Sequence, residues 1–251
     1  MEANWMDGKR NASRCSARGD GACGNSQYII LTMLACSGAP GTSRPHALRC
    51  RIRFTPRAAC MSLIALNKPF GTICQFSAHE TRASLGDWVK TPNVYPAGRL
   101  DADSEGLLLL TDDGALQARI AEPRHKLVKR YWAQVEGAPD DAVLARLAKG
   151  VDLGDYVTRA CRTAFVAAGD SDALWPRNPP VRYRAAIPTT WIELAITEGK
   201  NRQVRRMTAA VGHPTLRLVR VAIGALDLFA LGLAPGETVE VPPQAPWQRV
   251  G

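Results

Sequence analysis

The chain has 251 residues, enough to bury a full core in one large or two small domains. Its hydrophobic content of 46% and charged content of 22% are ordinary for a globular protein, and no apolar run approaches the roughly 18 residues of a membrane span, which excludes a membrane-spanning protein. The net charge of +9 favours an anionic partner such as nucleic acid.

Residues 1–60 differ in composition from the rest of the chain. They carry 9 Lys and Arg against 3 Asp and Glu, a net charge of +6, so residues 61–251 account for only +3. We interpret residues 1–60, which lack helical or strand periodicity, as a disordered extension or as sequence upstream of a true start at Met61. The isolated Cys74 and Cys161 of the folded part fit a reducing cytoplasm.

The first half of the folded part alternates short strands and helices. We predict strands at 62–66 and 107–110, and helices at 84–90 and 115–121 with Ser84 and Asp112 or Asp113 as caps. The four leucines at 107–110 indicate a strand that is buried on both faces. Lys68 precedes a proline in a turn-like segment, where it is either a substrate contact or a solvated turn lysine, and composition favours the solvated lysine.

The second half continues the same alternation. We predict strands at 131–137, 159–166, 189–197, 215–222 and 238–241, and helices at 140–149 and 202–211. Asn201 is the expected cap of the last helix, which should bury Val204, Met207 and Val211. Interleaved strands and helices without an internal repeat place the fold in the α+β or α/β class.

Residues 169–187 lack a clear period and form an insert loop rich in proline, arginine and aromatic residues. Trp175, Tyr183 and the arginines 177, 182 and 184 have planar groups that can stack on unpaired bases. The alternative is an ordinary surface loop that Trp175 pins to the domain. The sequence leaves both interpretations open.

The loop before the second predicted strand concentrates reactive side chains. Asp101, Asp103 and Glu105 follow the Gly98-Arg99 pair within a few residues, directly ahead of the leucine run. A buried strand fixes the loop that precedes it, and glycine lets the backbone bend tightly. The loop is therefore a candidate reactive site with a carboxylate close to a guanidinium.

Two basic clusters follow. Lys129-Arg130-Tyr131 combines cations with an aromatic ring, and residues 198–207 read Glu-Gly-Lys-Asn-Arg-Gln-Val-Arg-Arg-Met. The cations of the second cluster crowd the first turns of a predicted helix, where they oppose the helix dipole unless an anion binds there. This cluster predicts contact with a polyanion, with a solvated basic face as the alternative.

Together these motifs resemble one family. Gly98-Arg99-Leu100-Asp101 with Gly106-Leu107-Leu108-Leu109-Leu110-Thr111, the Lys-Arg-Tyr at 129–131 and the motif at 198–207 are similar to the RsuA-type RNA pseudouridine synthases, and most similar to their RluE branch, which acts on 23S ribosomal RNA. The insert sequence Trp175-Pro176-Arg177-Asn178-Pro179-Pro180 and the segment Pro214-Thr215-Leu216-Arg217-Leu218 strengthen the resemblance to this branch. The resemblance covers roughly residues 61–241. It implies an α+β fold with a mixed, largely antiparallel sheet, and a catalytic domain at 61–251 without the S4 domain that many relatives carry.

The resemblance also implies roles for individual residues. Asp101 would be the nucleophile, Arg205 the cation that stabilises it, and Tyr131 the ring that stacks on the flipped uracil. The residues expected to contact RNA are Arg99, Lys129, Arg130, Lys200, Arg202, Gln203 and Arg206. The reaction would need neither a cofactor nor a metal, and the four scattered histidines predict no metal site.

Two other functions remain open at this stage. Asp103 and Glu105 close to Asp101 would suit a hydrolase acting on an N-glycosidic bond, although we expect both acids to face solvent or to pair with Arg99. A ribosome-associated RNA-binding protein without activity would not need Asp101, Tyr131 and Arg205 together. We therefore predict a cytoplasmic, monomeric pseudouridine synthase that isomerises one uridine of 23S rRNA and does not contact a membrane.

Overall fold

The structure, a computed structural model, describes residues 62–125, 127–181 and 187–248. The expectations for residues 1–60, and those for Arg182, Tyr183 and Arg184 of the insert, lie outside the described residues. Among the residues that the structure describes, no helix is long and apolar enough to cross a membrane.

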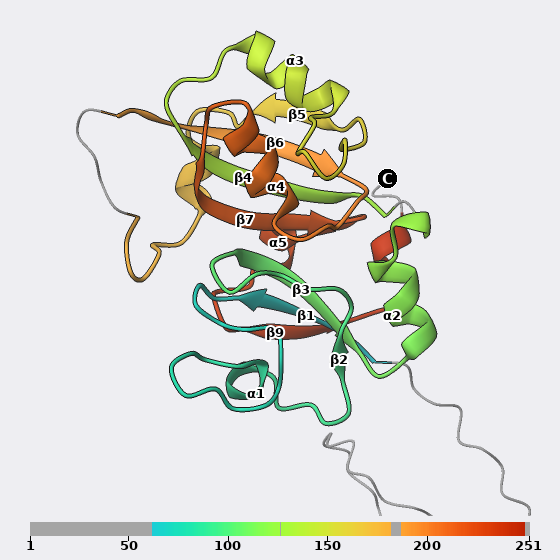
Figure 1. Cartoon of the computed structure of the whole chain (residues 1–251). Coiled ribbons are helices and arrows are strands. Elements are labelled where there is room, and N and C mark those ends of the chain that lie inside the picture. The colour runs from blue at the N-terminus through green and yellow to red at the C-terminus, as the bar shows by residue number, and fades with distance from the viewer. Residues whose placement is uncertain (1–61, 126, 182–186, 249–251) are drawn as a thin grey trace, which may run out of the picture. The chain divides into compact units, whose positions relative to one another are not determined.

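One mixed sheet organises the described part of the chain (Figure 1). Its strands are β1 (Leu63–Lys68), β2 (Tyr95–Pro96), β3 (Glu105–Thr111), β4 (Lys129–Glu136), β5 (Arg162–Phe165), β6 (Thr189–Ile196), β7 (Thr215–Ile223), β8 (Leu226–Asp227) and β9 (Thr238–Val241). Seven of them lie in the order β5-β6-β4-β7-β3-β1-β9, with β2 beside β3 and β8 beside β7. Among these nine strands only β3 and β7 pair in parallel, so the predicted α+β fold with a mixed, largely antiparallel sheet is confirmed.

Short helices flank this sheet. They are α1 (Leu85–Trp88), α2 (Gly114–Ala121), α3 (Asp141–Lys149), α4 (Gln203–Ala210) and α5 (Leu228–Leu231), with 3-10 helices η1 (Pro123–His125), η2 (Asp170–Ala173) and η3 (Ala245–Trp247). Asp113 caps α2 and Asp140 caps α3 through side-chain bonds to backbone N–H groups. The prediction that Asn201 caps α4 is wrong, because the N-cap is Arg202 in the left-handed region, with a φ of 49° and no side-chain cap bond.

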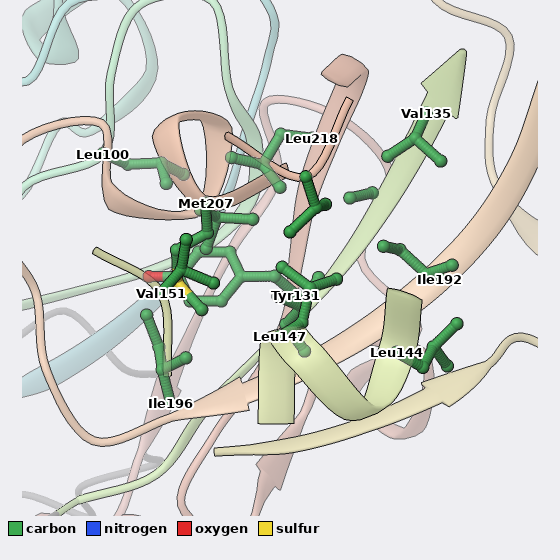
Figure 2. Packing of buried hydrophobic residues seen from close by; sticks show 14 residues of the cluster. Leu100, Tyr131, Val135, Leu144, Leu147, Val151, Ile192, Ile196, Met207 and Leu218 are labelled. Atoms are coloured by element: carbon green, nitrogen blue, oxygen red, sulfur yellow. The ribbon is translucent and has the colours of Figure 1, made fainter. Parts of the chain in front are cut away.

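The leucine run is buried on both faces, as its sequence predicts. Leu107 and Leu109 pack with α2, whereas Leu108 and Leu110 pack with α1 on the other face of the sheet. A third apolar cluster lies between β4, β6, α3 and α4, and it contains Leu100, Tyr131 and Met207 (Figure 2). Since Leu100 belongs to this cluster, the loop that carries Asp101 is anchored in the core next to Tyr131.

The contact between β3 and β7 joins two halves of the sheet, β5-β6-β4-β7 and β3-β1-β9 (Figure 1). It consists of two residue pairs, Glu105 with Val219 and Gly106 with Arg220. Gly106 has a φ of 99°, and a Cβ atom placed on it would lie 2.4 Å from the carbonyl oxygen of Arg220. The strands approach this closely only because residue 106 is a glycine.

We expect Gly106→Ala to lower the free energy of unfolding by about 3 kcal/mol, because the methyl group would meet the β7 backbone and the backbone angle is strained for any residue with a Cβ. Denaturant titration measures this change. Gly114→Ala is the matched control, since nothing lies within 4 Å of a Cβ there and α2 begins at this residue. Equal midpoints for Gly106→Ala and the natural chain would contradict the steric argument.

The prediction of a solvated Lys68 is wrong. β1 continues to this residue, whose side chain is fully buried, and its Nζ donates to the carbonyl oxygens of Pro69 and Thr72. Burial lowers the pKa of the Lys68 amine to about 8. The Lys68 amine thus stabilises the turn that follows β1 by binding its carbonyl oxygens. The sequence pattern of a strand followed by a turn does not reveal this contact.

Candidate active site

A pocket of about 290 Å³ opens where the Asp101 loop faces β4, β7 and the start of α4. Among the residues that line it, Arg99, Lys200 and Arg202 are exposed and form the rim, whereas Lys129, Tyr131 and Arg220 are buried and form the floor. The floor also includes apolar side chains from β6, α4 and β7, namely Ile196, Val204 and Leu218. The pocket therefore combines a basic mouth with a mixed interior, in which these apolar side chains lie beside the polar groups of Ser104, Lys129, Tyr131, Gln203 and Arg220.

Asp101 stands between this pocket and a second hollow of about 400 Å³. Its side chain is 36% exposed, and its carboxylate lies 3.8 Å from a guanidinium nitrogen of Arg202. The neighbouring Leu100 fixes the loop, because the Cys74 thiol donates to its carbonyl oxygen. The Asp101 carboxylate is thus accessible, while the adjacent residue Leu100 is fixed by the Cys74 thiol and by packing in the core.

Arg205, the predicted partner of Asp101, contacts Asp103 instead. Its Nη2 donates to the Asp103 carbonyl oxygen at 2.7 Å, and its Nε lies 3.5 Å from the Asp103 carboxylate. Burial lowers the pKa of the Arg205 guanidinium, while the charges of Asp103 and, more weakly, Asp101 counter this shift. Arg205 therefore binds the loop at Asp103, two residues after the expected partner Asp101.

The sequence predicts that Asp103 faces solvent or pairs with Arg99; its side chain is 37% exposed, and it forms an ion pair with Arg202 rather than with Arg99. It accepts two bonds from Arg202, at 3.1 and 2.9 Å. Burial by itself raises the pKa of Asp103, but the Arg202 bonds and the charges of Arg205 and Arg202 hold it below its usual value. Asp103 thereby neutralises cations beside Asp101.

Tyr131 lies on the floor of the pocket with 8% of its surface exposed. The register of β4 against β7 shifts by one residue between Arg130 and Tyr131, so that Tyr131 faces Arg220 rather than Val221. An Arg220 Nη1 lies 3.4 Å from the Tyr131 hydroxyl and 3.5 Å from the Arg99 carbonyl oxygen. Sequence reasoning placed Arg220 in a strand but gave it no role, because the register shift leaves no signal in the sequence.

The family of the chain follows from comparison with known proteins. Residues 62–210 match the family described as RNA pseudouridylate synthase. The chain belongs to this family. It is 55% identical over 177 residues to ribosomal large subunit pseudouridine synthase E of Xanthomonas campestris pv. campestris, covering 70% of this chain and 92% of that one. It is 51% identical over 179 residues to the enzyme of the same name from Vibrio vulnificus, covering 71% and 74%.

A solved pseudouridylate synthase supports the same assignment. Its crystal structure superposes with a TM-score of 0.60 at 27% sequence identity, over 74% of this chain and 72% of that one. The predicted membership of the pseudouridine synthases is confirmed, and the chain is an RNA pseudouridine synthase.

The basic residues expected to contact RNA divide into two groups in this synthase. Arg99, Lys200 and Arg202 lie at the pocket rim, and Lys200 also rests over the Tyr156 ring at 3.4 Å. The remaining four are engaged elsewhere or buried, and they are Lys129, Arg130, Gln203 and Arg206. Contact of these four with RNA stays a prediction; Lys129 and Gln203 are buried, whereas the side chains of Arg130 and Arg206 are each 36% exposed.

Strand alternation explains the split of the Lys-Arg-Tyr motif. Lys129 is buried in the pocket, but Arg130 points to the other face of β4, where Asp227 and Glu193 neutralise it. Arg206 pairs with Asp155, on the outer side of α4. Gln203 is buried and donates to Glu198 at 2.6 Å. Adjacent residues of a basic motif, such as Lys129 and Arg130, thus lie on opposite faces of a strand and contact different groups.

Glu105 and Trp175 form a second buried site that the sequence did not predict. Glu105 is 1% exposed and accepts two bonds from Arg217, both at 2.9 Å. The Trp175 indole donates to the same carboxylate at 2.8 Å, and Arg177 lies over the Phe70 ring. The expectation of a solvated or Arg99-paired Glu105 is wrong, and Trp175 pins the insert to the domain.

Metal ligation has no geometric basis in the ranges that the structure describes. No three His, Cys, Asp or Glu side chains come together there in an arrangement that would hold a metal ion.

Proposed function

We propose that this synthase isomerises a uridine of 23S rRNA, within the large ribosomal subunit or its precursor, and that Asp101 is the nucleophile. The large-subunit substrate is supported by the names of the relatives that are 51% and 55% identical. The observation that carries the role of Asp101 is its position. It is the accessible carboxylate of the pocket, on an anchored loop beside a buried tyrosine.

The reaction rearranges the nucleotide without adding or removing atoms. The Asp101 carboxylate adds to ribose C1′ or to the uracil ring, and the bond between C1′ and N1 breaks. The base rotates, a bond forms between C1′ and C5, and Asp101 is released. The proton leaves C5 and a proton is taken up at N1. Tyr131, which lines the same pocket as Asp101, provides the ring against which the uracil stacks and assists removal of the C5 proton.

Arg205 acts in this scheme as a positioning residue. Its bond to the Asp103 carbonyl oxygen holds the loop, and its charge attracts the Asp101 carboxylate at longer range. Arg202 provides the nearer cation. Arg99, Lys200 and Arg202 contact phosphates of the RNA around the extruded uridine. The hydrolase alternative loses support because the Glu105 carboxylate is occupied by Arg217 and Trp175.

We further propose that the protein acts as a monomer in the cytoplasm, where ribosomal RNA is the available substrate.

The test is incubation of the full chain with large-subunit rRNA from cells that lack this modification, followed by mapping of pseudouridine and chromatography for free uracil. We expect one new pseudouridine and no free uracil. Small-subunit rRNA is the control and should stay unmodified. Release of uracil would identify a hydrolase, and modification of small-subunit rRNA would contradict the proposed substrate.

A further inference from the structure

Two buried cations on the pocket floor have donors without partners. Lys129 is 6% exposed and Arg220 is 3% exposed, and neither Lys129 Nζ nor Arg220 Nη2 makes a hydrogen bond within the described residues. Other buried cations of the domain are satisfied, since Lys68 donates to two carbonyl oxygens and Arg217 to Glu105. Unpaired buried donors are costly and are retained where a ligand completes them.

The two cations also act on each other. Burial and, to a smaller extent, the charge of Arg220 together lower the pKa of the Lys129 amine to about 8. Both side chains line the same pocket, and an acceptor placed there would relieve the burial and the repulsion together. The missing partner is therefore an oxygen atom that carries or develops negative charge.

The surroundings indicate where that oxygen comes from. Ile196, Val204 and Leu218 line the pocket beside the two cations, and the Tyr131 ring lies next to them. A strongly hydrated phosphate would lose its water among these buried side chains, and exposed cations are available for it at the rim. A flat base fits the floor better, because its ring meets apolar surface while its carbonyl oxygens reach the donors.

We propose that Lys129 and Arg220 bind a carbonyl oxygen of the target uracil and stabilise the negative charge that this oxygen gains during the reaction. This inference rests on the proposed function. When the bond from C1′ to N1 breaks, its electron pair stays on the base and spreads from N1 to O2 and O4. When Asp101 instead adds to the ring, the electron pair moves to a carbonyl oxygen as an enolate. Either route places an anionic oxygen on the base, and preorganised cations lower its energy.

The one-residue register shift between β4 and β7 supports this assignment. Without the shift, Val221 would face Tyr131, and Arg220 would point to the opposite face of the sheet. Bulges of this kind re-aim a side chain and occur next to active sites. Here the shift directs a guanidinium to the end of the tyrosine ring, 3.4 Å from its hydroxyl.

The test is Lys129→Met, which keeps the length of the side chain and removes its charge. We expect the single-turnover rate at saturating enzyme to fall about 100-fold, with the Kd for rRNA within about twofold of the natural value. Lys149→Met, an exposed lysine at the end of α3, should change neither quantity. Arg220→Gln is less informative because Arg220 also donates to the Leu107 carbonyl oxygen of β3.

The pH dependence separates a charge effect from a structural one. The charged or titratable side chains that line the pocket with Lys129 are Arg99, Asp101, Tyr131, Lys200, Arg202 and Arg220. Since the pKa of Lys129 is about 8, kcat/KM should fall above that pH as the amine loses its proton. Lys129→Arg keeps the charge and should move this decline to higher pH. An unchanged decline would overturn the assignment.

A phosphate partner gives a different result. If Lys129 binds phosphate, Lys129→Met weakens RNA binding, reduces the slope of log Kd against log salt by about one and leaves the saturating rate unchanged, which would overturn the proposal. If Lys129→Met reacted at the rate of the unsubstituted protein while Asp101→Asn were inactive, the proposed role of Lys129 would be refuted and the proposed role of Asp101 would stand. An active Asp101→Asn would refute the proposed nucleophile.

Discussion

Asp101→Asn is expected to lower the rate of pseudouridine formation by about 10⁴-fold or more, because a neutral amide neither attacks carbon nor leaves again as a carboxylate. The substitution keeps the shape of a side chain that is 36% exposed and whose nearest cation lies 3.8 Å away. Folding should therefore be unaffected, and RNA binding should stay within about twofold. Single-turnover assays on undermodified large-subunit rRNA measure the rate, and filter binding measures the affinity.

Asp103→Asn is the informative comparison, because the two acids are two residues apart. Asp103 binds Arg202 and Arg205 and shapes the loop, so its substitution should slow the reaction by roughly 10-fold to 100-fold through misplacement of Asp101. It should also destabilise the domain, which Asp101→Asn should not. If Asp103→Asn abolished the reaction and Asp101→Asn did not, the nucleophile would be Asp103.

Arg217→Met is expected to lower the free energy of unfolding by about 3–5 kcal/mol. The substitution leaves the Glu105 carboxylate, 1% exposed, without its two bonds from the guanidinium. It also removes the bond from Arg217 to the Trp175 carbonyl oxygen, which ties the insert to β7. Denaturant titration measures the loss, and fluorescence of the tryptophans should report release of Trp175.

Two further variants isolate the effect of the buried charge. Arg124→Met removes the cation of an exposed ion pair with Glu122 and should leave the unfolding midpoint nearly unchanged. The double variant Glu105→Gln with Arg217→Met should be more stable than Arg217→Met alone, because no unpaired charge remains. A double variant as unstable as the single one would show that lost packing, rather than the buried carboxylate, causes the destabilisation.

The sequence predicts the principal strands and helices because each has a local signal. The leucine run of β3 is apolar on both faces since α1 and α2 cover opposite sides of it. The aspartates that cap α2 and α3 satisfy N–H groups within three residues. The two-residue strands β2 and β8 were missed because they contain too few residues to show a period.

The sequence does not determine which groups the buried polar side chains contact. The burial of Lys68 depends on a turn that folds back over its amine, and the partner of Arg205 depends on where a loop 102 residues away places its carbonyl oxygen. The role of Arg220 depends on a register shift that no local pattern encodes. Motif resemblance located the pocket, whereas the pairing of its charges followed only from the three-dimensional structure.

The division of the sheet into two halves has a consequence for partly folded chains. Asp101 precedes β3 and belongs to one half, whereas Tyr131, Lys129 and Arg220 belong to the other. In the part of the chain that the structure describes, the β3–β7 ladder joins these halves through two residue pairs, supplemented by the Arg217 bonds to Glu105 and the Arg220 bond to the Leu107 carbonyl oxygen. A chain that has formed one half therefore has either the carboxylate or the base-binding floor, but not both. On the roles proposed for Asp101 and for the pocket floor, we expect modification of RNA to require the completed sheet, and fragments or misassembled chains that still expose basic residues to be inactive.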